Sequence, residues 1–340
     1  MAQFETADDV VECLWGYSAS AALGAALELG LPWLLSEGPL AASAVAASLG
    51  IPLRRCGWWL QVLVRLGLLE RSSHGYSLTP GARRAILGTY ARDSWAFLAQ
   101  EDRERLPVVV DLIERLVLPA GHPDLPAPPP DYVARMAADP ERARRFTRML
   151  YDLHGPLAES LAATLDLAGV RRLLDLGGGS GVMSLALLRK NPALSVVVVD
   201  IPTVCAEGRR IAAENFLEGR ITFREGDLLA GELPRGFGAV LECDVGVYDP
   251  GLFAAVWAAL EEGGRFFVAD LLPESEDDYP DRVLHWGFTG SLTGSDGPRL
   301  TWPRLQDMLG AAGFAVEGTR QLIEGLRLVE ARRGPGAVAQ

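Results

Sequence analysis

Three glycine- or acid-bearing segments could together bind a nucleoside. The first is the run Asp175-Leu176-Gly177-Gly178-Gly179-Ser180-Gly181, the second ends in Asp200 and the third in Gly226-Asp227. Glycines let the backbone turn tightly and approach a ligand, which the N–H groups of the following helix then face. Asp200 is suited to accept hydrogen bonds from both hydroxyls of a ribose, and Asp227 to bind the amino group of adenine.

The spacing of the glycines separates this loop from two common phosphate sites. Val182 occupies the third glycine position of the dinucleotide pattern GxGxxG, and no GK[ST] follows as in a P-loop. The acid Asp175 also disfavours a phosphate group. The three segments therefore fit an adenosine that carries no phosphate groups, as in S-adenosylmethionine. The alternative is that these residues are only turn glycines and strand-end caps.

The elements that position these segments begin at Arg171, where strand-like segments start to alternate with helical patterns. This alternation predicts a Rossmann-like α/β domain with a parallel sheet of seven strands, covered by helices on both faces. The last two strands are joined too tightly for a crossover, so the final strand should be antiparallel. The strands are expected in RRLLDL, LSVVVVD, ITFRE, GAVLEC, GGRFFVAD, FAVEGTRQL and EGLRLVEAR, and helices in 181–190, 204–217, 251–262 and 301–312.

The first part of the chain, to about Ser94, has a different pattern. Residues 19–35 are apolar at helical spacing, and two short helices follow that break at Gly50 and Pro52. A turn at Ser72–Gly75 separates two strand-like pieces. Helices followed by a short hairpin are typical of a winged-helix module, which can bind DNA or form dimers.

The segments between these two parts read as a helical cover. Helices are expected over 95–118 and 131–166, and the proline-rich segment 118–132 should be a surface loop. We therefore expect a winged-helix-like domain over residues 1–98. Residues 99–340 should hold the helical cover and the α/β domain.

Composition and charge exclude several classes of protein. The chain has 340 residues, which suits two domains, and its formal net charge of −12 disfavours a nucleic-acid partner. Its four cysteines form no CxxC pair, so neither a zinc site nor a disulfide framework is indicated. No apolar run reaches the roughly 18 residues of a membrane span, and the first residues are acidic. We expect a cytoplasmic protein with no membrane partner.

The chain resembles the family of S-adenosylmethionine-dependent O-methyltransferases that includes plant phenol methyltransferases and bacterial polyketide-tailoring enzymes. The motifs are LLDLGGGSG, VVVVDIPTV, REGDLL, GGRFFVADLLP and LTWPRLQDMLGAAGF, and the resemblance covers nearly the whole chain. It implies a homodimer formed through the N-terminal domain. In that family Gly177 would line the methionine part of the cofactor, Asp200 the ribose, and Asp227 with Leu228 the adenine. Further cofactor contacts are expected from Asp175, Gly179, Ile201 and Cys243.

The segment after the fourth predicted strand departs from the family pattern. The family reads LHDWDD there, and its histidine takes a proton from the acceptor hydroxyl. This chain reads LECDVGVYDPG, with Gly246 near the histidine position and Glu242 where the family carries a lysine. The two acids that flank the family's histidine fall near Asp270 and Arg299. The standard base is therefore absent. This favours an acceptor that can attack before it loses a proton, such as an electron-rich carbon, or an acceptor that is already anionic.

Four side chains are candidates for catalysis. Tyr248 and Asp244 follow the fourth strand, His154 lies on the helix that covers the methyl group in the family, and His285 lies in the segment that lines the acceptor pocket. A purely structural role is equally open for both histidines. No pattern of metal ligands is present.

We therefore predict a homodimeric S-adenosylmethionine-dependent methyltransferase of a small aromatic or heteroaromatic secondary metabolite, of the kind made in antibiotic biosynthesis. The missing histidine favours methylation of an indole- or enol-like carbon. An O-methyltransferase of a phenol or acid with an atypical base is the first alternative. The second is an enzyme that binds S-adenosylmethionine without methylating, such as a hydroxylase or pericyclase. The third is a winged-helix regulator that senses a nucleoside.

Overall fold

The structure is a computed structural model that forms two compact units, Met1–Val110 and Asp111–Gln340. It describes residues 4–118, 122, 132–229, 232–275, 277–278, 281–292 and 300–334. Most of the proline-rich segment 118–132 and the position of Arg299 lie outside these residues. Each unit has its own hydrophobic core.

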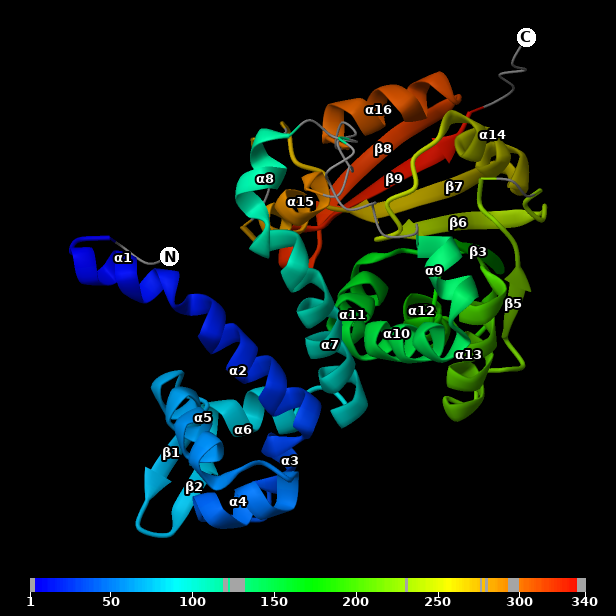
Figure 1. The fold of residues 1–340 in the computed structure, drawn as a ribbon. Helices are drawn as coiled ribbons and strands as arrows, with labels where there is room; N and C mark the ends of the chain where they lie inside the picture. The colour runs from blue at the N-terminus through cyan, green and yellow to red at the C-terminus, as the bar shows by residue number, and fades with distance from the viewer. Residues whose placement is uncertain are drawn as a thin grey trace. The chain divides into compact units, whose positions relative to one another are not determined.

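Unit 1 is a helical domain with a short hairpin (Figure 1). Gly30 and Gly50 adopt left-handed backbone conformations that end the second and fourth helices. The two strands pair antiparallel, which confirms the predicted winged-helix pattern. The elements are α1 (Ala7–Leu14), α2 (Gly16–Leu29), α3 (Leu31–Leu34), α4 (Ala42–Leu49), α5 (Leu53–Arg65), β1 (Leu69–Ser72), β2 (Gly75–Leu78), α6 (Pro80–Leu87) and α7 (Arg92–Val110). Helix α7 spans the boundary predicted between residues 98 and 99, and the whole helix belongs to unit 1.

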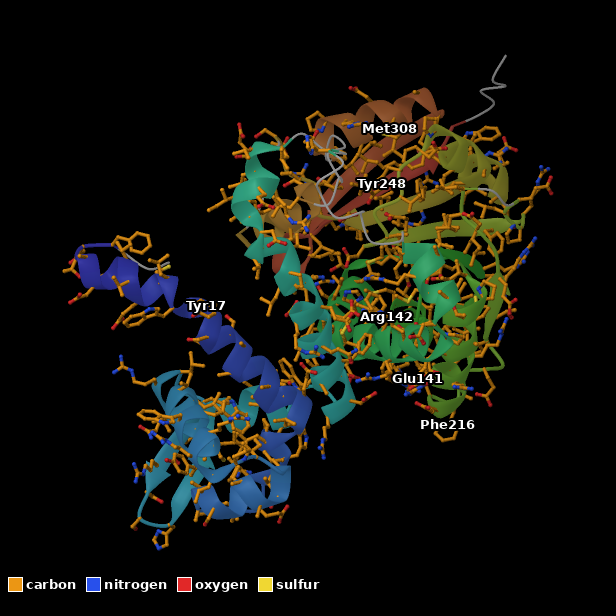
Figure 2. The ribbon with its side chains drawn as sticks, viewed as in Figure 1. Tyr17, Glu141, Arg142, Phe216, Tyr248 and Met308 are labelled. Atoms are coloured by element: carbon orange, nitrogen blue, oxygen red, sulfur yellow. The ribbon has the colours of Figure 1, made fainter. Side chains whose placement is uncertain are left out.

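Helices α1 and α2 present a long apolar surface. Residues 7–29 are long and apolar enough to cross a membrane by length and composition alone, and 11% of the most apolar 18-residue window is buried. This finding contradicts the expectation that no stretch of the chain is apolar enough over such a length, although the run without a charged residue, between Glu12 and Glu28, is itself shorter than 18 residues. Leu14, Trp15 and Tyr17 are 69%, 62% and 71% exposed, and Figure 2 labels Tyr17 on α2. A patch of this kind marks an interaction surface.

Unit 2 is built on a seven-stranded sheet with the order β5-β4-β3-β6-β7-β9-β8. Strands β3 to β7 are parallel, and β9 runs antiparallel to both β7 and β8. This confirms the predicted sheet and its antiparallel last strand. The strands are β3 (Arg172–Leu176), β4 (Ser195–Asp200), β5 (Ile221–Glu225), β6 (Phe237–Cys243), β7 (Leu260–Asp270), β8 (Phe314–Gln321) and β9 (Arg327–Arg333).

Helices cover both faces of this sheet (Figure 1). Successive strand residues such as Phe266 and Phe267 are both fully buried and belong to two different core clusters, because side chains alternate between the faces of a strand. The first cluster includes α11 and α12, and the second includes α14 and α16. The helices are α8 (Leu112–Val117), α9 (Tyr132–Ala138), α10 (Pro140–Leu153), α11 (Gly155–Thr164), α12 (Val182–Lys190), α13 (Pro202–Glu214), α14 (Pro250–Ala259), α15 (Asp281–Ser291) and α16 (Trp302–Ala311).

The strand order reverses beside β3. The chain moves from β3 to β4 on one side and later returns to β6 on the other side of β3. In open α/β sheets, ligands bind at such a reversal, outside the carboxyl ends of the strands. The glycine-rich loop that follows β3 lies at this place.

Candidate functional site

The loop between β3 and α12 is shaped by glycines that no other residue could replace without strain. Gly177, Gly179 and Gly181 have φ values of 60°, 58° and 77°. A Cβ atom on Gly177 would lie 2.7 Å from the Val245 side chain, and one on Gly178 would lie 2.5 Å from Asp175 Oδ2. The loop therefore packs its backbone against the ends of two strands.

Asp200 joins this loop to the end of β4. Its Oδ2 accepts a hydrogen bond from the Gly179 N–H at 2.8 Å, and its Oδ1 accepts one from the Ile201 N–H at 2.7 Å. Burial raises the pKa of Asp200 to about 6, and these two backbone bonds oppose the rise. A carboxylate has about four lone-pair positions, so Asp200 can still accept further hydrogen bonds.

Asp175 lies beneath the same loop and is almost completely buried. The Ser184 hydroxyl donates to its Oδ2 at 2.5 Å, whereas Oδ1 has no hydrogen-bond partner within the described chain. Burial raises the pKa of Asp175 to about 7, and the bond from Ser184 opposes this. An unpaired buried oxygen beside a glycine cradle suits a ligand with hydrogen-bond donors.

The remaining predicted cofactor residues lie at neighbouring strand ends. Asp227 is exposed after β5, and its Oδ1 accepts a hydrogen bond from the Leu229 N–H at 2.9 Å. The half-buried Leu228 lies beside it. Cys243 is the last residue of β6 and is half-buried. The structure therefore gathers the three predicted segments at one edge of the sheet.

His154 and Asp244 come together at the end of β6. His154 lies between α10 and α11, and its Nε2 is 3.3 Å from Asp244 Oδ2. Asp244 follows β6 with a φ of 55°, a left-handed conformation that is uncommon for residues other than glycine. Both side chains are partly exposed, at 27% and 39%. The pair can therefore meet a ligand at this edge.

Tyr248 belongs to a second group of acids at the same edge. Its phenol oxygen lies 3.2 Å from Glu242 Oε2 and is hydrogen-bonded to Asp270 Oδ2. Burial raises the pKa of the Tyr248 phenol and of the Glu242 carboxyl well above their ordinary values, and raises the pKa of Asp270 to about 6. Tyr248 packs on the face of the sheet that also carries Met308 of α16 (Figure 2).

One predicted site residue has no described side chain. His285 lies in α15, and its side chain is outside the part that the structure describes. Among the described residues, no group of three metal-binding side chains is present. The sequence also did not indicate the contacts of Glu242. Its partners lie in the segment that follows β6, and the sequence pattern of that segment does not show which groups face the Glu242 side chain.

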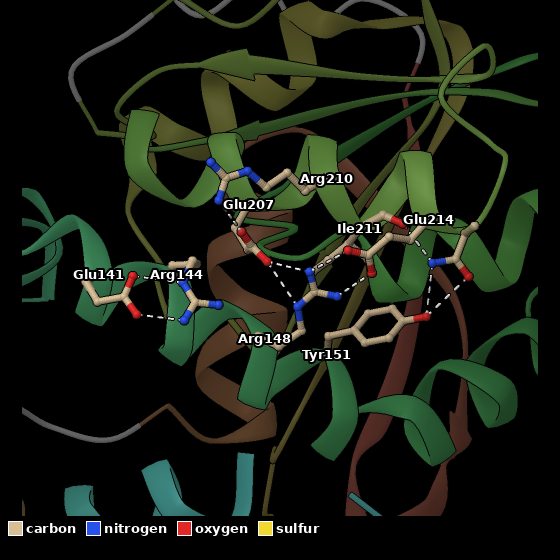
Figure 3. Close-up of polar contacts among 9 residues, drawn as sticks. Glu141, Arg144, Arg148, Tyr151, Glu207, Arg210, Ile211 and Glu214 are labelled. Atoms are coloured by element: carbon tan, nitrogen blue, oxygen red, sulfur yellow. Dashed lines mark hydrogen bonds and ion pairs between the residues drawn. The ribbon is translucent and has the colours of Figure 1, made fainter. Parts of the chain in front are cut away.

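A charged network ties α10 to α13 (Figure 3). Arg148 donates to Glu207 Oε1 at 2.6 and 3.0 Å and to Glu214 Oε2 at 2.5 Å, while Glu207 is 2% exposed. Tyr151 and Asn215 add hydrogen bonds between the same helices. The helix that ends before His154 is thereby held to the helix that begins after Asp200.

Comparisons with known proteins place the chain among enzymes of one type. Residues 131–315 match the model of the O-methyltransferase domain, and residues 11–86 match the O-methyltransferase dimerisation domain. The chain is 31% identical to the 3-hydroxy-5-methyl-1-naphthoate 3-O-methyltransferase of Streptomyces sahachiroi, and the match covers 94% of both chains. It is 28% identical to the N,N-dimethyltransferase OxyT of Streptomyces rimosus, over 95% and 94% of the two chains.

The fold also agrees with a solved structure of the same type. An O-methyltransferase family protein from Burkholderia thailandensis superimposes with a TM-score of 0.80 at 22% identity, covering 98% of this chain and all of the other. At this identity, the likeness supports the fold.

Proposed function

The chain belongs to the O-methyltransferase family, and from this premise we propose that it transfers the methyl group of S-adenosylmethionine to a hydroxyl oxygen of a small aromatic secondary metabolite. When bound, S-adenosylmethionine supplies an electrophilic methyl carbon on a sulfonium centre. The observation that carries the proposal is the glycine cradle after β3, which is joined to the buried carboxylate of Asp200.

The residues at the carboxyl edge fit this cofactor. Acids dominate the edge, with Asp175 and Asp200 buried beside the loop, so a phosphate-bearing nucleotide is disfavoured and a cationic nucleoside is favoured. Gly177, Gly179 and Asp175 would hold the methionine part. Asp200 would accept the ribose hydroxyls, and Ile201, Asp227, Leu228 and Cys243 would surround the adenine side.

The pairing of His154 with Asp244 favours oxygen as the methylated atom. A hydroxyl group is a poor nucleophile until its proton is removed, and imidazole is the most common general base in proteins. The preference for a carbon acceptor rested on the lack of a histidine after β6. His154 approaches this place from the α10–α11 junction and is held by the Asp244 carboxylate, so a base is available there. A carbon acceptor remains the second candidate, since Gly246 stands near the family's histidine position.

The acceptor that we propose is a hydroxylated aromatic acid or polyketide. The relative from Streptomyces sahachiroi is named for a hydroxynaphthoate, which has a phenolic hydroxyl on a fused aromatic ring. Turnover should release S-adenosylhomocysteine and a product heavier by one methylene group. Release of S-adenosylhomocysteine with a carbon-bound methyl would support the second candidate. Conversion of the acceptor without S-adenosylhomocysteine would identify a non-methylating enzyme.

Asp200→Ala is expected to weaken the binding of S-adenosylmethionine by about 1–3 kcal/mol, because a charged hydrogen-bond acceptor is lost. Calorimetric titration measures this directly, with Asp200→Asn as the variant that keeps the shape and loses the charge.

The wild-type affinity should also fall as the pH drops through about 6, since Asp200 then becomes protonated and accepts hydrogen bonds less strongly. Unchanged affinity in Asp200→Ala, or tight binding of NAD by the wild type, would refute the assigned site.

We also propose a cytoplasmic homodimer that forms through the exposed apolar face of α1 and α2. Replacing both Leu14 and Tyr17 with glutamate should convert the dimer to a monomer in light-scattering measurements, because two charges would be buried in an apolar interface. Phe216→Glu is the matched control, since Phe216 is 89% exposed at the end of α13. A dimer that survives the double substitution would place the interface elsewhere.

A further inference from the structure

We propose that Glu242, Tyr248 and Asp270 form an ordered proton relay, in which Glu242 donates to Tyr248 and Tyr248 donates to Asp270. The relay positions the turn that carries Asp244 against His154, and this part of the proposal rests on the proposed function. In this proposal none of the three relay residues contacts the acceptor. They act on the site by holding the backbone of the turn that follows β6.

Tyr248 has only one phenol proton for its two carboxyl partners. The Tyr248 oxygen is hydrogen-bonded to both Glu242 Oε2 and Asp270 Oδ2, yet a phenol carries one proton and can donate only one of these bonds. The other bond forms only if a carboxyl group donates it. One of the two carboxyls is therefore protonated.

The surroundings identify Glu242 as the protonated partner. Glu242 is 1% exposed, so its charged form would lose nearly all solvation, whereas Asp270 is half-buried at the end of β7. The N–H groups of Val245 and Gly246 both donate to Glu242 Oε1 at 3.2 Å. With Oε1 accepting both bonds, Oε2 is the oxygen that can carry a proton toward Tyr248. The two bonds oppose the rise in the pKa of Glu242, and burial outweighs them. Asp270 Oδ1 accepts a hydrogen bond from the Leu271 N–H at 2.6 Å, and its half-buried side chain keeps part of the solvation that a negative charge needs.

The charges around the relay support one proton on Glu242. Burial first, and then the nearby acids Glu242, Asp244, Asp175 and Asp270, raise the pKa of the neighbouring Cys243 thiol, so several carboxyl groups crowd this place. Asp270 also lies opposite Arg327 of β9 in the sheet, and the Arg327 guanidinium is bound to Glu274. Within the part of the chain that the structure describes, no cation pairs with Glu242, so a second buried negative charge there would have no described counter-charge.

Glu242 is hydrogen-bonded to the turn that carries Asp244. Its Oε1 holds two successive N–H groups directly after Asp244, the residue with the left-handed backbone. The side chain of Asp244 faces His154 Nε2 from this turn. Glu242 therefore fixes the orientation of Asp244 and, through it, of the imidazole.

Infrared difference spectra test the relay without any substrate. At about pH 8, above the ordinary range of the other carboxyls, the wild type should show the carbonyl stretch of a protonated carboxylic acid. This band should disappear in Glu242→Gln and persist in Asp270→Asn. Loss of the band in Asp270→Asn instead, or its absence from the wild type, would overturn the assigned order. The result does not depend on methyl transfer, so failure of the proposed function would leave it intact.

Turnover tests the positioning role. Glu242→Ala should lower kcat by about 10²-fold with little change in KM, because loss of the turn geometry displaces the base by a fraction of an ångström or more. Glu242→Gln should recover most of this loss, since its Oε1 can accept the two N–H bonds and its Nε2 can donate to Tyr248. Equal activity of the Ala and Gln variants would refute the positioning role. Cofactor affinity, measured in each variant, shows whether the protein has folded.

The stability of the wild type should also fall as the pH rises from about 4.5, because the folded protein then keeps a proton on Glu242 that the unfolded chain releases. Glu242→Gln should lack this part of the decline in thermal unfolding. An identical pH dependence in the two proteins would count against a protonated Glu242.

Discussion

His154→Gln is expected to lower kcat by about 10²- to 10⁴-fold, the usual range for loss of a general base. Glutamine keeps a polar group of similar length but cannot take a proton at neutral pH. The affinity for S-adenosylmethionine should stay unchanged, because the cofactor residues lie on the loops after β3, β4 and β5. Steady-state turnover and calorimetric titration of the same preparation separate these two effects.

The pH dependence of this variant distinguishes a base from a structural residue. A phenol has an ordinary pKa near 10, so its ionised fraction rises with pH. Turnover by His154→Gln should therefore keep increasing with pH, whereas turnover of the wild type should depend less steeply on pH, because a base within the site takes the proton. His74→Gln is the matched control, since His74 is an exposed histidine in the hairpin of unit 1. Full activity of His154→Gln would remove His154 from the mechanism and favour a carbon acceptor.

Asp244→Asn provides the complementary measurement for the pair. The amide keeps the shape of the carboxylate but no longer stabilises an imidazolium, so turnover should fall by less than in His154→Gln. The two substitutions together should cost little more than His154→Gln alone, since residues that act as a unit are not additive. Additive losses would mean that Asp244 acts separately from His154.

The cofactor residues at the carboxyl edge of the sheet could be predicted from the sequence, because each of them belongs to a short local motif. The glycines of Gly177–Gly181 and the acids Asp200 and Asp227 each follow a strand directly. Parallel strands bring their carboxyl ends to one edge of a sheet, so three local motifs predict a shared site without knowledge of any long-range contact. The antiparallel last strand follows from a similar local signal, the short connection between the last two strands.

The acceptor side could not be predicted in this way. His154 and Asp244 are far apart in the sequence, and their 3.3 Å contact depends on how the α10–α11 junction sits over the end of β6. The sequence singled out each residue separately, but no periodicity or spacing links them. The sequence showed only that Glu242 stands where the family carries a lysine. Its hydrogen bonds to Val245, Gly246 and Tyr248 are seen in the structure alone.

The packing that delivers His154 explains why this region needs charged residues in its interior. Helix α10 has a charged face that must lie against α13, and Glu207 on that contact is almost fully buried. Arg148 satisfies one oxygen of Glu207, and Arg210 reaches the other at 3.3 Å. The geometry of the base therefore depends on an ion pair as well as on apolar contacts.

Arg148→Met should lower the free energy of unfolding by about 3 kcal/mol, because removal of one partner leaves a buried charge with inadequate compensation. Arg210 still contacts Glu207, which places the expected loss at the lower end of the range for broken buried pairs. Urea unfolding, followed by circular dichroism, measures the change. Arg148→Met with Glu207→Met should recover much of the loss, since an apolar pair of similar volume leaves no uncompensated charge.

Arg144→Met is the matched control for this prediction. Arg144 lies on the same helix and pairs with Glu141 at 2.6 Å, but the Glu141 side chain is 65% exposed (Figure 3). Water solvates both partners of such a surface pair, so its loss should change stability much less than the loss of Arg148. Equal destabilisation by the two substitutions would mean that Arg148 acts as an ordinary surface charge. Greater destabilisation by Arg148→Met, accompanied by reduced turnover in the folded variant, would show that the ion pair both stabilises unit 2 and holds His154 in place.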